Sequence, residues 1–231
     1  MKAMWMVCLV LPSLSMAATW QSFVESGWKV EKAVDGDLNA DGRADKVLVL
    51  QQQDPKKWRA NAGLGTDKLD LNPRRLLVLL QDGQGWKQAA RNDRILPSAN
   101  SLETPCLADP LENGGIGIKK GVLGITLNYW LSCGSYGTSN KTYRFRHEQG
   151  RWPLIGLEDK QFSRSTHDED NRSYNFVTGK AIVGTLRNSD IGSDDNRETA
   201  KEHSENVRNP RLDLNMRDFN QRFDAWQQSQ Q

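Results

Sequence analysis

The stretch DLNADGRAD, Asp37–Asp45, is followed almost directly by the apolar run VLVL, Val47–Leu50. It places oxygen-bearing side chains at loop positions 1, 3, 5 and 9, and a glycine at position 6. Glycine permits a sharp turn, and calcium takes about six to eight oxygen ligands. The aliphatic run predicts a buried β-strand, so the segment is expected to be strand–loop–strand.

An EF-hand does not fit this loop, because that motif needs a bidentate glutamate at position 12 and flanking helices. Position 12 here is Leu48, inside the predicted strand. Residues Gly36–Asp45 instead resemble the calcium loops of FG-GAP/VCBS-type repeats, the blades of integrin-like propellers. That resemblance implies a Ca2+ site with the following ligands: the side chains of Asp37, Asn39, Asp41 and Asp45, and the carbonyl oxygen of Arg43. A hairpin turn that binds no metal is the alternative.

The first residues have the parts of a secretory signal peptide. Lys2 precedes an apolar run from Ala3 to Leu14, and small residues follow as far as Ala18. The run is shorter than the about 20 apolar residues that a membrane span needs. We therefore expect residues 1–17 to be removed, and the mature chain to be periplasmic or secreted, without a membrane span.

The three cysteines agree with export. Cys8 lies inside the predicted signal peptide, which leaves Cys106 and Cys133 in the mature chain. An even number of cysteines is favoured in an oxidising compartment, and we expect a disulfide between these two. Two free buried thiols, or half of a metal site, are the alternatives, although no CxxC spacing supports zinc.

Composition and motifs exclude several classes of function. The chain has 31 Lys and Arg against 29 Asp and Glu, a net charge of +2 at pH 7. This balance gives no electrostatic reason to expect nucleic acid as a partner. The three histidines are scattered, and the sequence lacks HExxH, GxSxG and a Gly-rich phosphate loop. The sequence thus predicts a protein without enzymatic activity.

Residues 18–187 have the pattern of a β-rich domain. Three pairs of strands are expected to form hairpins: 75–81 with 86–91, 116–118 with 122–127, and 142–147 with 151–156. A further strand is expected at 173–180. Because a propeller needs at least four blades of four strands, the chain is too short for more than a small one. The expected fold is mainly β, with antiparallel sheets built from blade-like hairpins in a curved sheet, a sandwich or a small incomplete propeller.

The C-terminal part of the sequence is different in character. Residues 188–211 are rich in Asp, Glu, Ser and Asn and are expected to be a polar linker or mobile loop. Residues 212–231 are expected to form an amphipathic helix, with these side chains on one face: Met216, Phe219, Phe223 and Trp226. The helix either docks on the sheet or is offered to a partner.

The order of these elements is similar to that of a loose group of uncharacterised exported bacterial proteins. The similar words are Gly36–Val49, Val78–Asp93, Gly115–Leu123 and Thr142–Gly156. The similarity extends over most of the mature chain. It implies no activity.

The loop Ser132–Asn140 is unusual because small polar residues lie beside Trp130 and Tyr136. Aromatic side chains among small polar ones suit protein or glycan recognition, and a packed hairpin tip is the structural alternative. We expect an exported, calcium-stabilised binding module that recognises another protein, either of the envelope or delivered to it, as an immunity or inhibitor protein does. The alternative is an envelope hydrolase or a carbohydrate- or peptidoglycan-binding domain.

Overall fold

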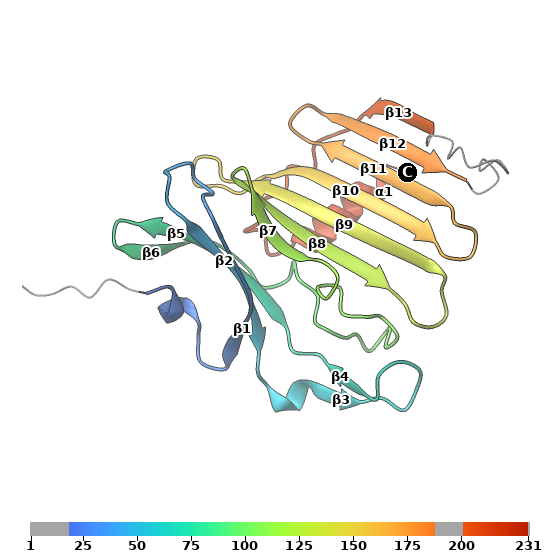
Figure 1. Ribbon diagram of the computed structural model, residues 1–231, viewed down its shortest axis with the longest axis horizontal. Coiled ribbons are helices and arrows are strands. Elements are labelled where there is room, and N and C mark those ends of the chain that lie inside the picture. Colours follow the sequence, from blue (N-terminus) through green and yellow to red (C-terminus); the bar gives the residue numbers. More distant parts are fainter. Residues whose placement is uncertain (1–18, 188–200, 231) are drawn as a thin grey trace, which may run out of the picture.

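The computed structural model describes residues 19–187 and 201–230. The predicted signal peptide, residues 1–17, lies outside the described residues, as does the part of the predicted linker from 188 to 200. The described chain forms two main antiparallel sheets, one small hairpin and a C-terminal helix (Figure 1). The mainly β fold with a C-terminal helix is thus confirmed. Among the described residues, no helix is long and apolar enough to cross a membrane.

The first sheet is a four-stranded antiparallel meander. Its strands, in spatial order, are β1 (Trp28–Gly36), β2 (Asp45–Gln52), β5 (Arg74–Asp82) and β6 (Gly85–Asn92). The apolar run of β2 is fully buried because both faces of this sheet are covered. Val47 and Val49 face the second sheet, whereas Leu48 and Leu50 pack under the 3-10 helix η1 (Trp20–Phe23). The sheet has the four-stranded format of one propeller blade.

A small hairpin is inserted between β2 and β5, at the lower edge of the view in Figure 1. It consists of the 3-10 helix η2 (Pro55–Lys57) and the strands β3 (Trp58–Ala60) and β4 (Lys68–Asp70). The sequence did not predict this hairpin, because strands of three residues are too short to show an alternating pattern.

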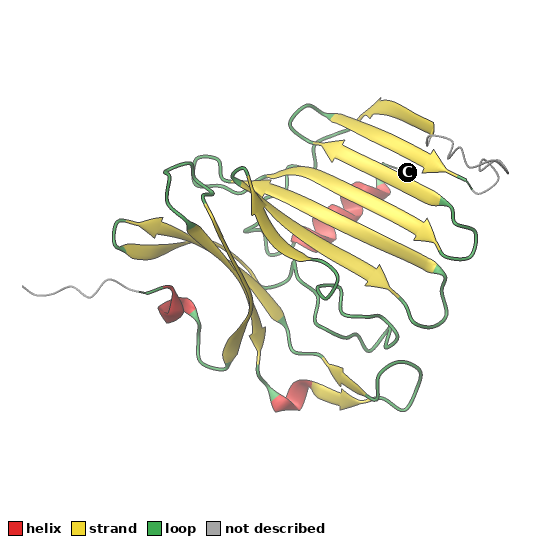
Figure 2. Ribbon diagram, in the orientation of Figure 1, coloured by secondary structure: helices red, strands yellow, loops and turns green. Residues whose placement is uncertain are grey.

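The second sheet is a seven-stranded antiparallel meander in which chain neighbours are also spatial neighbours. Its strands are β7 (Gly115–Lys119), β8 (Val122–Trp130), β9 (Gly137–Arg146), β10 (Leu154–Ser163), β11 (Glu169–Asn175), β12 (Lys180–Leu186) and β13 (Lys201–Asn206). The three predicted hairpins are present, and β9 and β10 are longer than predicted. Figure 2 shows the sheet as a broad curved surface with the helix on one of its faces.

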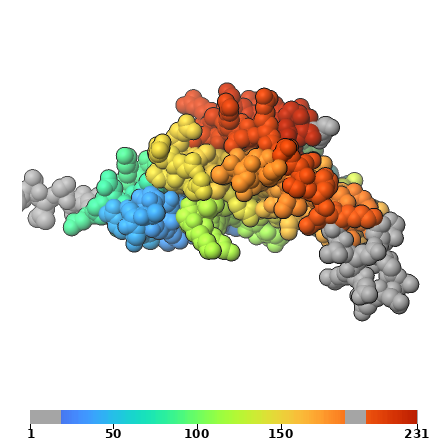
Figure 3. Space-filling model, turned by 90° about the horizontal axis from the view of Figure 1, so that it is seen from above, coloured from blue at the N-terminus to red at the C-terminus, as the bar shows by residue number. Residues whose placement is uncertain are grey.

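The C-terminal helix α1 (Phe219–Gln228) docks on the inner face of the seven-stranded sheet. Phe219, Phe223 and Trp226 are buried, and the ring centroid of Phe223 lies 5.1 Å from that of Tyr143 on β9. In the space-filling view the C-terminal residues, red, cover one side of the molecule (Figure 3). The docked interpretation of the helix is therefore the one that the structure shows.

Three predicted boundaries differ from the structure. Residues 173–180 are not one strand: the Asn175 side chain accepts hydrogen bonds from the amides of Val177 and Thr178, which turns the chain between β11 and β12. The predicted linker 188–211 contains strand β13, whose pairing with β12 does not depend on apolar side chains. Helix α1 begins at Phe219 and not at 212.

Residues 212–214 are extended because they link the two sheets. The backbone amide of Leu214 donates to the carbonyl of Trp152 at 2.9 Å, and the buried Asn92 side chain of β6 donates to the Leu214 carbonyl at 2.6 Å. A buried ionic contact joins the four-stranded sheet to the loop before β7, where the guanidinium of Arg74 lies between the carboxylates of Glu31 and Asp109. The two sheets share one apolar core.

Candidate functional site

The acidic loop, residues 37–45, connects β1 to β2 and is held by its own polar groups. The Asp37 carboxylate accepts hydrogen bonds from the amides of Ala40 at 2.7 Å and Gly42 at 2.9 Å. Ala40 and Gly42 have φ values of 62° and 80°, in the left-handed region that glycine and short turns favour. The turn therefore closes through carboxylate–amide hydrogen bonds.

Asp45 anchors the acidic loop to the four-stranded sheet. Its side chain is fully buried, and its two oxygens accept from the amides of Leu38 at 2.8 Å and Gln81 at 3.0 Å. A buried carboxylate is stable only when such donors replace water. The first and last aspartates of the loop thus have structural hydrogen bonds of their own.

Asp41 and Asn39 lie at the exposed side of the acidic loop. The Arg43 guanidinium donates to the Asp41 carboxylate at 2.9 Å, and the Asn39 amide donates to the same oxygen at 3.1 Å. The hydrogen bond from the Arg43 side chain, together with that from its backbone amide, lowers the pKa of Asp41. Asp41 is therefore charged at neutral pH and faces a cation of the chain itself.

The acidic loop supplies hard oxygen donors, which suit calcium in kind. Among the described residues, however, no group of three or more Asp, Glu, His or Cys side chains is arranged to hold a metal ion. The reason is visible in the loop, where the carboxylates point at backbone amides and at Arg43. Asp37 Oδ2, Asp41 Oδ1 and the two oxygens of Asp45 each accept one hydrogen bond and keep a second lone pair, so the donor set is compatible with calcium if Arg43 moves away from Asp41.

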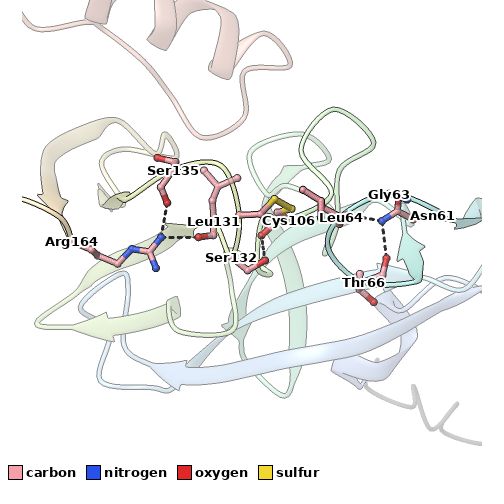
Figure 4. Close-up of a disulfide and its surroundings, with 10 residues drawn as sticks. Asn61, Gly63, Leu64, Thr66, Cys106, Leu131, Ser132, Ser135 and Arg164 are labelled. Atoms are coloured by element: carbon pink, nitrogen blue, oxygen red, sulfur yellow. Dashed lines mark hydrogen bonds between the residues drawn. A yellow bond between two sulfur atoms is a disulfide. The ribbon is translucent and has the colours of Figure 1, made fainter.

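The predicted disulfide is present between Cys106 and Cys133, whose Cα atoms lie 5.7 Å apart. It fixes the disulfide loop, residues 131–136, against the segment around Cys106. The amide and hydroxyl of Ser132 both donate to the Cys106 carbonyl, at 3.0 and 3.2 Å (Figure 4). β9 begins at Gly137, so the loop predicted as 132–140 is shorter than expected.

Arg164 holds the other side of the disulfide loop. Its guanidinium donates to the carbonyls of Leu131 at 2.9 Å and Ser135 at 2.6 Å, as Figure 4 shows. The same group lies 5.1 Å from the ring centroid of Trp130, within the range of a cation–π contact. The backbone amide of Arg164 also donates to the Tyr136 carbonyl at 2.9 Å. Trp130, the last residue of β8, and Tyr136, six residues later, are thus linked through one arginine.

The structure adds two residues to this surface that sequence reasoning missed. Trp58 and Leu64, of the inserted hairpin, line a groove of about 700 Å³ together with Trp130 and the disulfide. We call this the aromatic groove. Trp58 is 40% exposed, Leu64 72%, Trp130 39%, and Tyr136, in the disulfide loop, 68%. Three of the large exposed apolar residues therefore line one groove, and a fourth lies in the disulfide loop, whose Ser132 and Cys133 also line it.

The walls of the aromatic groove are set by close packing. Gly65, with φ 99°, lies so near the Pro105 carbonyl that a Cβ atom there would be 2.4 Å from its oxygen. Only glycine lets the tip of the inserted hairpin reach the disulfide segment. On the hairpin, the Lys68 ammonium lies 4.8 Å from the ring centroid of Trp58. Each of the two tryptophans that line the groove, Trp58 and Trp130, therefore has a cationic side chain over its ring.

The histidines do not converge with a nucleophile within the described residues. The rings of His147 and His167 contact aromatic rings of Trp152 and Phe162, at centroid distances of 5.0 and 6.1 Å. His203 lies on the exposed strand β13. No described histidine ring is hydrogen-bonded to a serine or cysteine side chain.

The acidic loop and the aromatic groove are therefore two separate candidate sites. The first suits a cation in its donor atoms, and the second offers apolar rings at the surface. Comparison of the chain with protein-family models, with curated proteins and with solved structures finds no match.

Proposed function

We propose that this protein is an exported, non-enzymatic binding module that recognises another protein through the aromatic groove. An immunity or inhibitor protein, which neutralises a protein delivered to the periplasm, is the specific form of this proposal. The observation that carries it is the gathering of the exposed residues Trp58, Leu64 and Trp130 in one groove. Grouped exposed apolar side chains mark interaction sites, and Trp, Tyr and Arg dominate binding energies at protein interfaces.

The rigidity of the surface supports the same proposal. The disulfide and Arg164 fix the loop beside Trp130, and Gly65 brings the inserted hairpin against it. A surface that is already ordered loses little conformational entropy on binding, so more of the contact energy appears as affinity. This arrangement favours a preformed recognition surface over a mobile one.

Calcium enters the proposal as a structural ligand of the acidic loop. Asp37, Asn39, Asp41 and Asp45, with the carbonyl of Arg43, remain the proposed donors. The acidic loop and the aromatic groove lie at opposite ends of β2, since Asp45 begins that strand and the inserted hairpin follows its end. A cation in the loop is therefore expected to stabilise the folded state without touching the partner.

A glycan ligand is the second candidate, and the polar lining of the groove favours it. Asn100 and Glu112 line the groove together with the two tryptophans, and Glu112 is exposed. Rings that stack on tryptophan while their hydroxyls bind amide and carboxylate groups have the chemistry of a sugar. On this reading the protein is a carbohydrate- or peptidoglycan-binding domain, or part of an envelope hydrolase.

The two candidates are separated by one experiment. The mature chain, residues 18–231, is immobilised and exposed to envelope extract, in parallel with its Trp130→Ala variant and with purified peptidoglycan. One stoichiometric protein bound by the wild type and lost in the variant supports protein recognition. Saturable binding to peptidoglycan that Trp130→Ala abolishes supports the glycan candidate and contradicts the first. A circular dichroism melt of the variant checks that it is folded.

A further inference from the structure

The outer face of the seven-stranded sheet carries a second hollow, on the side away from α1. It has a volume of about 600 Å³ and is lined by residues of β7, β8 and β9 and of the loop before β7. Its floor contains Gly117 of β7 and Gly124 of β8, which are directly opposite each other in the antiparallel register. This face is turned toward the viewer in Figure 1. We call it the glycine hollow.

No neighbouring atom in the part of the chain that the structure describes requires glycine at these two positions. Neither residue has a positive φ, a Cβ atom on Gly117 would meet nothing within 4 Å, and one on Gly124 would meet only a carbonyl oxygen at 3.8 Å. Glycine inside a strand lowers the stability of that strand. One reason for a glycine there is that it lets a ligand or a second backbone approach closely. The pair therefore costs stability without a benefit to the fold itself.

Neighbouring glycines differ in this respect. A Cβ atom on Gly36 would lie 2.8 Å from the Ile118 side chain, one on Gly114 2.3 Å from the Thr126 carbonyl oxygen, and one on Gly156 3.1 Å from that of Tyr174. Packing within the chain accounts for those three. Gly117 and Gly124 stand apart because the space above them is open.

The charges around the hollow have one sign. Lys119, Lys120 and Arg144 line it, and no Asp or Glu is among the lining residues. Lys32 reaches the same edge, with its ammonium 3.1 Å from the position of a Cβ atom on Gly115 and 2.7 Å from the Leu111 carbonyl. The guanidinium of Arg144 is paired with Glu158 at 3.2 Å. Within residues 19–187 and 201–230, no carboxylate forms an ion pair with Lys119 or Lys120.

The glycine hollow adjoins the aromatic groove. Glu112 lines the groove, and Asn113, the next residue, lines the hollow. The segment 107–115 is thus a common wall, and a partner protein bound in the groove has the hollow within its reach.

Resting on the proposed function, we infer that the glycine hollow receives an acidic segment of the partner protein. The bare strands would admit the segment's backbone, where Cα–H groups of glycine can contact carbonyl oxygens. The lysines at the rim would then face its carboxylates, and charge complementarity of this kind sets orientation and specificity. An acidic extended peptide is the occupant that both features fit.

The test uses the 15N-labelled mature chain and a synthetic hexapeptide of alternating glutamate and alanine, followed by heteronuclear NMR. We expect shifts at Gly117, Gly124, Lys119 and Lys120, and at least tenfold weaker binding in Gly117→Val and in Lys120→Glu. Valine is expected to be tolerated at this open strand position, so the melting temperature of Gly117→Val should equal or exceed that of the wild type. Lys160→Glu, an exposed lysine elsewhere on β10, is the matched charge control and should bind like the wild type.

Three results with the peptide would overturn the inference. These are no shift at the hollow, unchanged affinity in a folded Gly117→Val variant, or equal weakening by Lys160→Glu. Binding of a galacturonic acid trisaccharide in place of the peptide would also reject it and would assign the hollow to an anionic sugar. The result is independent of the pulldown: a partner that requires Trp130 but is insensitive to Gly117→Val leaves the proposed function intact and removes only this inference.

Discussion

The acidic loop and the aromatic groove lie at opposite ends of β2 and are built in opposite ways. The loop is one continuous segment whose aspartates accept hydrogen bonds mostly from amides a few residues away. The groove joins an inserted hairpin, the segment at Cys106 and the loop after β8, which meet only in the folded chain. The first is locally determined and polar, whereas the second depends on tertiary contacts and a covalent bond.

This difference assigns separate roles to the two regions. In the acidic loop, the buried Asp45 serves the fold by joining the loop to β5. In the groove, large apolar side chains remain at the surface although the structure fixes the backbone around them. Stability should therefore respond to changes in both regions, and binding only to changes in the groove.

The largest expected effect on stability comes from the disulfide. The double variant Cys106→Ser/Cys133→Ser should lose about 3.5 kcal/mol of unfolding free energy, because the 27-residue separation no longer restricts the unfolded chain. Urea unfolding of the mature protein measures this loss, and the wild type under reducing conditions should match the variant. An unchanged midpoint would show that the groove is held without its covalent link.

Calcium should give the next largest change. If the acidic loop binds it only in the folded state, calcium at a hundred times its dissociation constant adds about 2.7 kcal/mol of stability. Chelator should lower the melting temperature of the wild type and leave that of Asp41→Ala unchanged. Identical melting temperatures of the wild type in saturating calcium and in chelator would show that calcium does not stabilise the folded protein.

A substitution at Asp45, the buried end of the acidic loop, should change the unfolding free energy by as much as calcium does or by less. Asp45→Asn keeps one acceptor oxygen but turns an amide group toward a backbone donor, and should cost about 2 kcal/mol. Asp35→Asn, which removes an exposed carboxylate that pairs with Lys46, is the matched control and should cost less than about 1 kcal/mol. Equal losses in urea unfolding would mean that Asp45 is not the anchor of the loop.

The smallest expected effect is the pH dependence of the exposed pair in the acidic loop. Because Arg43 lowers the pKa of Asp41, the folded state binds this proton less readily than the unfolded state. The contribution is thus present above the unfolded pKa of about 3.9 and is lost as pH falls through the lower folded pKa. Asp41→Asn should reduce the change of the melting temperature with pH in this acidic window, and nowhere else. A difference between variant and wild type that varies between pH 6 and 8 would contradict this assignment.

What the sequence predicted follows the same division. The strand at 47–50 and the three hairpins were readable because apolar runs and Gly turns are local signals. The turn after Asn175 was missed since its side-chain hydrogen bonds interrupt an otherwise alternating pattern. Strand β13 was missed because all six of its residues are exposed and polar, so that only pairing with β12 reveals it.

The aromatic groove could be predicted only in part. Trp130 and Tyr136 stood out beside a loop of small residues, but Trp58 belongs to a three-residue strand 72 positions before Trp130. Its place in the groove depends on the close approach of Gly65 to Pro105. No periodicity or spacing encodes such a meeting of distant segments. The charged segment around Trp58 was the one available signal.

The most direct test of the division between the two regions is the affinity of the captured partner for two variants. Isothermal titration in saturating calcium compares the wild type with Trp130→Ala and Asp41→Ala, each checked for folding. We predict at least tenfold weaker binding for Trp130→Ala, as for a central interface tryptophan, and unchanged binding for Asp41→Ala. Unchanged affinity in Trp130→Ala would contradict recognition through the aromatic groove, and a loss confined to Asp41→Ala would place recognition at the acidic loop instead.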